Sequence, residues 1–129
     1  MELSKLVTAP RHDAGAEMRV NDEFGNPTDF YITLAGQDST AWRFSESDKR
    51  QAAYSALTID DETDRKSAVY GSVVDQYVSI TLSWRGLVDD SGEEICQSAE
   101  AAKGVYISAP YILDQALKFV GDRGNFTGS

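Results

Sequence analysis

The chain has 129 residues, with 12 Lys and Arg residues against 21 Asp and Glu residues, and a formal net charge of −9. This length fits one domain with its own core. The acidic balance argues against direct binding to nucleic acid or to an anionic membrane surface, because both require a basic footprint. The single cysteine excludes an intramolecular disulfide and a cysteine-rich zinc site. Because the first residues also lack the apolar core of a signal peptide, the sequence predicts a cytoplasmic protein.

The N-terminal part predicts a β-hairpin over residues 14–36. Apolar and polar residues alternate in AEMRV (16–20) and in DFYITLAG (29–36), and this alternation is typical of strands with one buried face. The joining segment NDEFGNPT (21–28) is rich in residues that form turns.

Helical segments follow the hairpin. Asp38 or Ser39 can accept hydrogen bonds from the first turn of a helix, and the thin apolar stripe of that helix predicts a largely solvent-facing element. The predicted helices span residues 39–57, 60–85, 98–106 and 109–121. The predicted fold class is therefore α+β, a mainly α-helical small domain with an N-terminal β-hairpin, in which residues 1–129 form a single domain.

The end of the second helix is ambiguous between helix and strand. The segment VSITLSWRGLV (78–88) alternates apolar and polar residues, which favours a strand, but an upstream apolar face continues through it with helical spacing. We favour the helix, with the β-branched residues costing only tenths of a kcal/mol each. Trp84 then closes the core just before Gly86 ends the helix.

Residues that could carry chemistry are few. The lone His12 has no evident catalytic or metal-binding partner and is expected in a solvated loop. Cys96 is expected to be a small, partly buried side chain. The glycines form no phosphate-binding loop, and no carboxylate pair stands out in such an acidic chain. We expect no enzymatic activity, no metal and no cofactor.

Aromatic residues concentrate near the C-terminus, around the last predicted helix. Such residues belong to the core more often than to an interface, yet aromatic side chains also dominate interfaces. The candidate partner-binding residues are Tyr106, Tyr111, Phe119 and Phe126. Phe126 is expected to dock back onto the domain or onto a neighbour. The expected structural core includes Trp84, Gly86, Leu113, Leu117 and Val120.

Two segments of the C-terminal half carry a distinctive pattern. The segment WRGLVDDSGEEICQSAEAAKGVY (84–106) has a tryptophan, a Gly-Leu step, an acidic turn and then S-x-E-x-A at the opening of a helix. The segment APYILDQALKFVGDRGNF (109–126) has a predicted helix and a closing D-R-x-N-F. In both segments the chain resembles the tail assembly chaperones of long-tailed bacteriophages. The N-terminal half is similar more loosely, through its Gly-, Asn- and Pro-rich turn. One departure is the β-branched VSIT (78–81), where the family pattern implies a plain helix.

This resemblance implies an assembly factor of the host cytoplasm. Such a protein would bind the tape measure protein, self-associate into a homo-oligomer along it, recruit the tail tube protein, and be absent from the mature virion. The family often makes a longer second product by ribosomal frameshifting. An acidic protein of this kind could hold the apolar surface of an elongated helical partner in solution.

Two other functions remain open on the sequence. The net charge of −9 is compatible with an inhibitor that mimics the DNA phosphate backbone and blocks a host DNA-binding enzyme. Such a protein would carry its acids along one face and bind in a salt-sensitive way. A structural neck or tail component of the virion is the other alternative.

Overall fold

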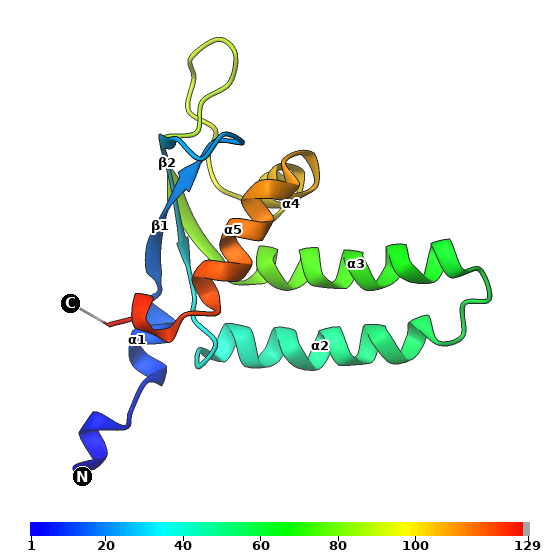
Figure 1. Ribbon diagram of the computed structural model, residues 1–129, viewed down its shortest axis with the longest axis horizontal. Coiled ribbons are helices and arrows are strands. Elements are labelled where there is room, and N and C mark those ends of the chain that lie inside the picture. The colour runs from blue at the N-terminus through cyan, green and yellow to red at the C-terminus, as the bar shows by residue number, and fades with distance from the viewer. Residues whose placement is uncertain (128–129) are drawn as a thin grey trace.

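A three-stranded antiparallel sheet forms the base of the molecule, in a computed structural model that describes residues 1–127. The strands are β1 (Ala16–Asn21), β2 (Pro27–Leu34) and β3 (Thr81–Arg85), and β2 lies in the centre. The β1–β2 pair is the predicted hairpin, and helices make up most of the remaining chain (Figure 1). The predicted α+β fold class is thus confirmed.

The strand alternation separates a buried face of the sheet from a polar one. Met18, Ile32 and Trp84 lie side by side across the three strands on the face that meets the core. On the opposite face, the Arg85 guanidinium lies 4.0 Å from the centre of the Tyr31 ring and binds the Glu17 carboxylate at 2.8 Å. An antiparallel sheet with one solvated face gives this pattern.

The helices begin where capping residues allow. The main helices are α1 (Ala9–Ala14), α2 (Thr40–Ala56), α3 (Glu62–Ser79), α4 (Ala99–Ser108) and α5 (Pro110–Val120), with short 3-10 turns η1 (Leu3–Lys5) and η2 (Arg123–Asn125). The side chains of Ser39, Asp61 and Ser98 each accept a backbone N–H in the first turn of α2, α3 and α4. Each cap satisfies a donor that the helix itself leaves unpaired.

One cluster of buried residues holds the sheet and the helices together. It contains side chains from β1, β2 and α2 to α5, and also Phe126 from the C-terminal segment. Within the part of the chain that the structure describes, every buried side-chain nitrogen or oxygen has a hydrogen-bond partner. The core is therefore continuous and its polar groups are satisfied.

The predicted helix over residues 60–85 is wrong at its C-terminal end. Helix α3 stops at Ser79, and residues 81–85 form β3 along the free edge of β2. The carbonyl of Ile80 accepts the N–H of Ala35 at 2.9 Å, which joins the end of the helix to the end of β2. A helix continued to Trp84 would leave the edge of β2 unpaired, so pairing with a distant strand overrides the helical spacing.

The residues expected in the core behave differently from one another. Leu113 and Val120 are buried, whereas Trp84 is half-buried and donates its indole N–H to the Ile95 carbonyl at 2.8 Å. Leu117 is 40% exposed, so its placement in the core is wrong. Helix α5 buries Ile112, Leu113, Ala116 and Val120, and Leu117 lies at the edge of that stripe. Gly86 is exposed and has a different structural role.

Gly86 ends β3 in a conformation that only glycine adopts easily. Its φ is +87°, and a β-carbon there would overlap the carbonyl oxygen of Asp29. Glycine therefore allows the chain to leave the sheet in close contact with the start of β2.

Replacement of Gly86 by alanine is expected to lower the free energy of unfolding by about 1–3 kcal/mol for the backbone conformation, with the overlap at Asp29 adding to this loss. The control is Gly92→Ala, because Gly92 has a φ of +88° but open space around its α-carbon. Chemical denaturation of both variants separates the two causes. Equal losses in the two variants would contradict a role for the contact with Asp29.

Candidate protein-binding surface

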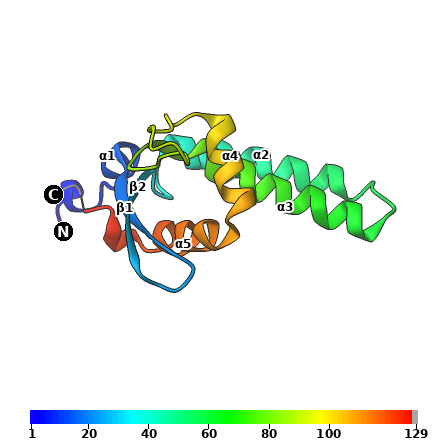
Figure 2. The ribbon, with the colours of Figure 1, turned by 90° about the horizontal axis from the view of Figure 1, so that it is seen from above.

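Helices α2 and α3 form an antiparallel hairpin that projects away from the sheet. Figures 1 and 2 show this arm in two perpendicular views, with the 57–61 turn at its far end. The end of the arm nearest the sheet is packed against the core, where the rings of Trp42 and Tyr77 meet edge to face at 5.7 Å. The far half of the arm lacks this support.

One face of α3 continues from the core into solvent. Tyr77 is buried, Val73 is partly buried, and Tyr70 and Val69 are 47% and 43% exposed. These residues follow the spacing of a single helical face. An open hollow of about 510 Å³ on α3 is lined by Val69, Tyr70 and Val73 and by the charged residues Glu62, Arg65 and Lys66. We call Val69, Tyr70 and Val73, with these charged residues as their rim, the α3 surface.

The charged residues at the rim of the α3 surface are held in place by local contacts. Lys66 pairs with Glu62 at 3.2 Å, one helical turn away. Arg65 donates two hydrogen bonds to the Ile59 carbonyl, at 3.0 and 3.1 Å, and so closes the turn at the end of the arm. The α3 surface therefore has an apolar centre and an ionic border, which matches the apolar core and polar rim of protein interfaces.

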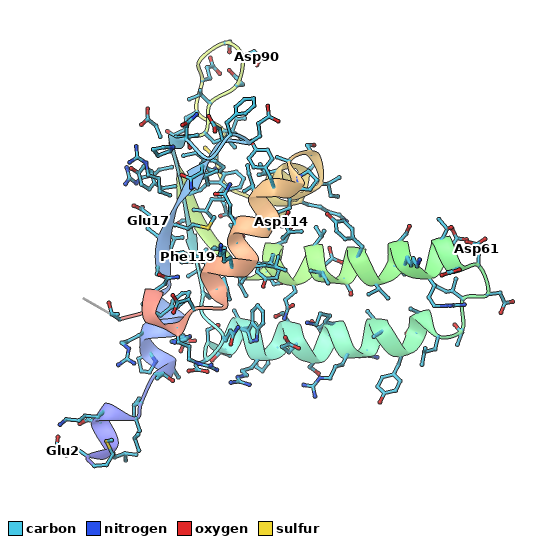
Figure 3. All side chains as sticks on the ribbon, viewed as in Figure 1. Glu2, Glu17, Asp61, Asp90, Asp114 and Phe119 are labelled. Carbon is cyan, nitrogen blue, oxygen red and sulfur yellow. The ribbon has the colours of Figure 1, made fainter. Side chains whose placement is uncertain are left out.

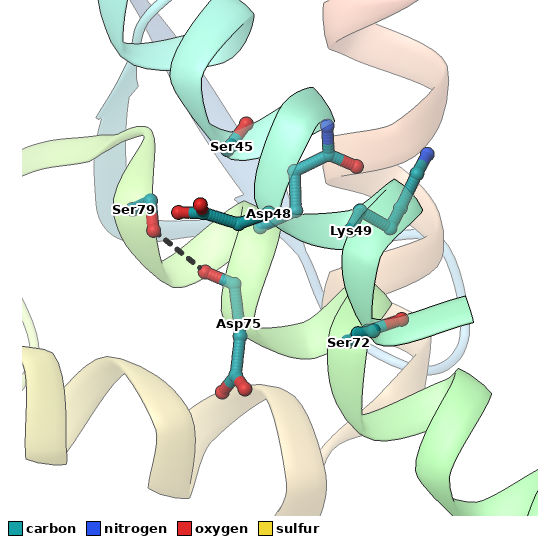
Figure 4. Close-up of a pocket in the computed structure, with 8 residues that line it drawn as sticks. Ser45, Asp48, Lys49, Ser72, Asp75 and Ser79 are labelled. Atoms are coloured by element: carbon teal, nitrogen blue, oxygen red, sulfur yellow. Dashed lines mark hydrogen bonds between the residues drawn. The ribbon is translucent and has the colours of Figure 1, made fainter. Parts of the chain in front are cut away.

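A polar cleft of about 200 Å³ lies between α2 and α3, as Figure 4 shows. The hydroxyls of Ser45, Ser72 and Ser79 each donate to a carbonyl of their own helix, at 2.6 to 2.9 Å. Gln76 donates to the Glu46 carboxylate at 3.1 Å across the hairpin. Since these hydroxyls are already bonded to the backbone, the cleft joins the helices and offers no activated nucleophile.

The four aromatic residues predicted to bind partners do not form one surface. Tyr106 is buried, and its hydroxyl lies 2.7 Å from that of Thr81. Burial raises the pKa of Tyr106 to about 12. Phe126 is also buried, so it docks back onto its own domain, and the partner-binding role predicted for these two residues is wrong. Tyr111 is 38% exposed and Phe119 is half-buried, and they remain available on α5.

Phe126 closes the C-terminal segment over His12. The two rings stack at 4.8 Å, and Arg11 donates to the Phe126 carbonyl at 3.1 Å. His12 is 1% exposed, so its predicted place in a solvated loop is wrong. Gly36 permits this arrangement, because a β-carbon there would overlap the imidazole ring. The N- and C-terminal segments are thus fastened together.

The Asp38 carboxylate also joins the N-terminal segment to the C-terminal segment. It accepts from Arg123 at 3.0 and 3.2 Å and from Thr8 at 2.6 Å, and these bonds hold its pKa well below the usual range. The backbone N–H of Asp38 donates to His12 Nδ1 at 3.0 Å. Burial is the main cause that lowers the pKa of His12, although the Asp38 carboxylate partly opposes it. We call Thr8, His12, Asp38 and Arg123 the terminal clasp.

Other chemical sites are not evident among residues 1–127. No group of three or more His, Cys, Asp and Glu residues in this range could hold a metal ion. Cys96 is exposed, not partly buried as expected. No helix in the described range has the length and apolar character needed to cross a membrane. Comparison with protein-family models, curated proteins and solved structures finds no match to this chain.

Sequence reasoning missed the α3 surface although its signal was present. Tyr70, Val73 and Tyr77 share one helical face in the sequence, but the spacing alone did not assign that face to a partner. The middle of α2, SESDKRQ (45–51), is fully polar, so this helix could not bury the apolar face of α3. An amphipathic helix without an apolar partner predicts an exposed face.

Stability is expected to depend on His12 between about pH 7 and pH 5. The folded-state pKa of His12 lies below its ordinary value of 6.5, so the unfolded chain binds more protons and stability falls as the pH drops through this range. Denaturation of the wild-type chain and of His12→Asn across this range measures the effect. The variant keeps an acceptor for the Asp38 N–H, and its stability should be nearly constant. The same pH slope in both proteins would show that another group is responsible.

Proposed function

We propose that the protein is a tail assembly chaperone of a long-tailed bacteriophage that binds the tape measure protein through the α3 surface. The observation that carries this proposal is the projecting α2–α3 arm, whose apolar face runs from the core out into solvent. A helical partner with its own apolar stripe would cover Tyr70 and Val69 and extend the packing that Tyr77 begins. The resemblance of residues 84–126 to this family gives independent support.

In this proposal the protein acts in the host cytoplasm, self-associates, helps to recruit the tail tube protein and is absent from the mature virion. It requires no catalysis and no cofactor. The net charge of −9 would keep a complex with an elongated, largely apolar partner in solution. A longer product of ribosomal frameshifting belongs to the same proposal.

The wide separation of four acidic residues weighs against a DNA mimic. Figure 3 shows Glu2, Glu17, Asp61 and Asp90 at four separate extremities: the N-terminal segment, the outer face of the sheet, the end of the arm and the β3–α4 loop. An imitation of a phosphate backbone requires acids in a continuous row along one face. The third possibility, a neck or tail component, differs in a single observable, its presence in purified particles.

The direct test replaces an aromatic residue of the α3 surface. Tyr70→Ser is expected to weaken binding to a helical segment of the tape measure protein by tenfold or more, as measured by calorimetry. A loss of this size is typical when one well-packed side chain is removed from an interface. Stability should change little, because nearly half of the Tyr70 side chain is exposed in the unbound chain.

The matched control is Tyr54→Ser, which removes a 74% exposed tyrosine from α2 of the same arm. It is expected to bind the segment as the wild-type chain does. A wild-type chain that binds no segment of the tape measure protein would overturn the proposed function. Equal weakening in the two variants would move the binding site away from the α3 surface.

A further inference from the structure

The first seven residues form an apolar segment that its own domain leaves uncovered. Met1, Leu3, Leu6 and Val7 are 96%, 76%, 59% and 44% exposed, and η1 buries no side chain. The first attachment to the domain is Thr8, which donates to Asp38 at 2.6 Å. Four neighbouring apolar side chains in water favour association with another apolar surface. We call residues 1–7 the N-terminal arm.

An open apolar groove lies elsewhere on the same molecule. Phe30 of β2, Leu87 and Ile95 of the β3–α4 connection, and Val105 and Ile112 of α4 and α5 line a space of about 430 Å³. Gly104 widens it, because a β-carbon at that position would meet no atom within 4 Å. This volume is in the range of roughly 300–1,000 Å³ that ligand-binding pockets occupy. We call this space the α4 groove.

The N-terminal arm and the α4 groove face away from each other. Figures 1 and 2 show the arm leaving the domain beside α1, on the side opposite to α4. The terminal clasp fixes the point from which the arm starts. The N-terminal arm is therefore directed away from the α4 groove of its own copy.

The charges beside the α4 groove and on the N-terminal arm are of opposite sign at Lys5. The loop beside the groove carries Asp89, Asp90, Glu93 and Glu94, and none of these four forms an ion pair with any of residues 1–127 at the usual distance. Lys5 lies within the arm and is likewise exposed and without an ion pair in that range. A bound arm would place Lys5, which stands between Leu3 and Leu6, beside an acidic rim that lacks counter-charges, with Glu2 at the start of the arm outside that contact.

We propose that the N-terminal arm of one copy binds in the α4 groove of a second copy of this chain. Leu3 and Leu6 would fill the apolar groove, and Lys5 would face the acidic loop. Such contacts are heterologous, so each copy offers an arm to one neighbour and a groove to another, and the assembly grows as a ring or an open chain. This mode deepens, and rests on, the self-association within the proposed function.

The test compares full-length variants of each partner surface. Leu3→Ser with Leu6→Ser alters the arm, and Gly104→Val fills the groove without backbone strain. Each is expected to weaken self-association by about tenfold or more, measured by sedimentation across a wide concentration series. Phe24→Ser is the control, because it removes an 81% exposed side chain from the β1–β2 turn, outside both surfaces. It should associate as the wild-type chain does.

A mixture of the two altered chains gives the decisive result. The arm variant keeps its groove and the groove variant keeps its arm, so together they form one productive contact and should give a dimer that grows no further. A mixture that stays monomeric overturns the proposal. Wild-type association of the Gly104→Val variant also overturns it, because the arm would then occupy another surface.

The outcome is separable from that of the proposed function. A wild-type chain that stays monomeric but binds the tape measure segment through Tyr70 would overturn only the arm–groove contact. A chain that assembles through its N-terminal arm but binds no segment of the tape measure protein would overturn the proposed function and leave the arm–groove contact standing.

Discussion

The junction between α3 and β3 is the constraint on which the rest of the molecule depends. Ile80 is fully buried there, and its carbonyl accepts the N–H of Ala35. The hydroxyl of Thr81 lies 2.7 Å from both the Tyr77 carbonyl and the Tyr106 hydroxyl. These few atoms join the end of α3 to the central strand and to α4, and therefore fix the direction in which the remainder of α3 runs.

That direction has a functional consequence. Because the end of α3 is buried in the core, its first half extends beyond the sheet and carries Val69 and Tyr70 into solvent. The α2–α3 hairpin is packed against the core at one end and presents its apolar face along its length. A preorganised helical surface loses little conformational freedom on binding, which favours its use for a helical partner. The terminal clasp holds the opposite side of the domain and sets where the N-terminal arm begins.

Local patterns in the sequence predicted the hairpin, the α+β class and a helix capped by Asp38 or Ser39, and Ser39 is the residue that caps α2. They failed where a contact between distant residues decided the structure. In VSIT (78–81) helical spacing and strand alternation coincide, and only the free edge of β2, more than 40 residues earlier, resolves the ambiguity. His12 likewise meets Asp38 and Phe126 across 26 and more than 100 residues.

The candidate site was predictable only in part. Tyr70 and Val73 were visible as an apolar helical face, but no local signal separates a face buried in its own domain from one left for a partner. Tyr106 and Phe126 show the reverse case, since aromatic residues near the C-terminus suggested an interface and instead complete the core. Burial is set by the summed packing of all elements, and a short window of sequence does not contain it.

The most direct measurement of partner binding is a nuclear magnetic resonance titration of the isotopically labelled chain with a helical segment of the tape measure protein. Binding through the α3 surface predicts that the largest shifts in backbone amide resonances occur between Lys66 and Val73, with little change at Tyr31 and Arg85 on the outer face of the sheet. Shifts confined to the sheet or to α5, with α3 unchanged, would contradict the assignment of the α3 surface as the partner-binding site.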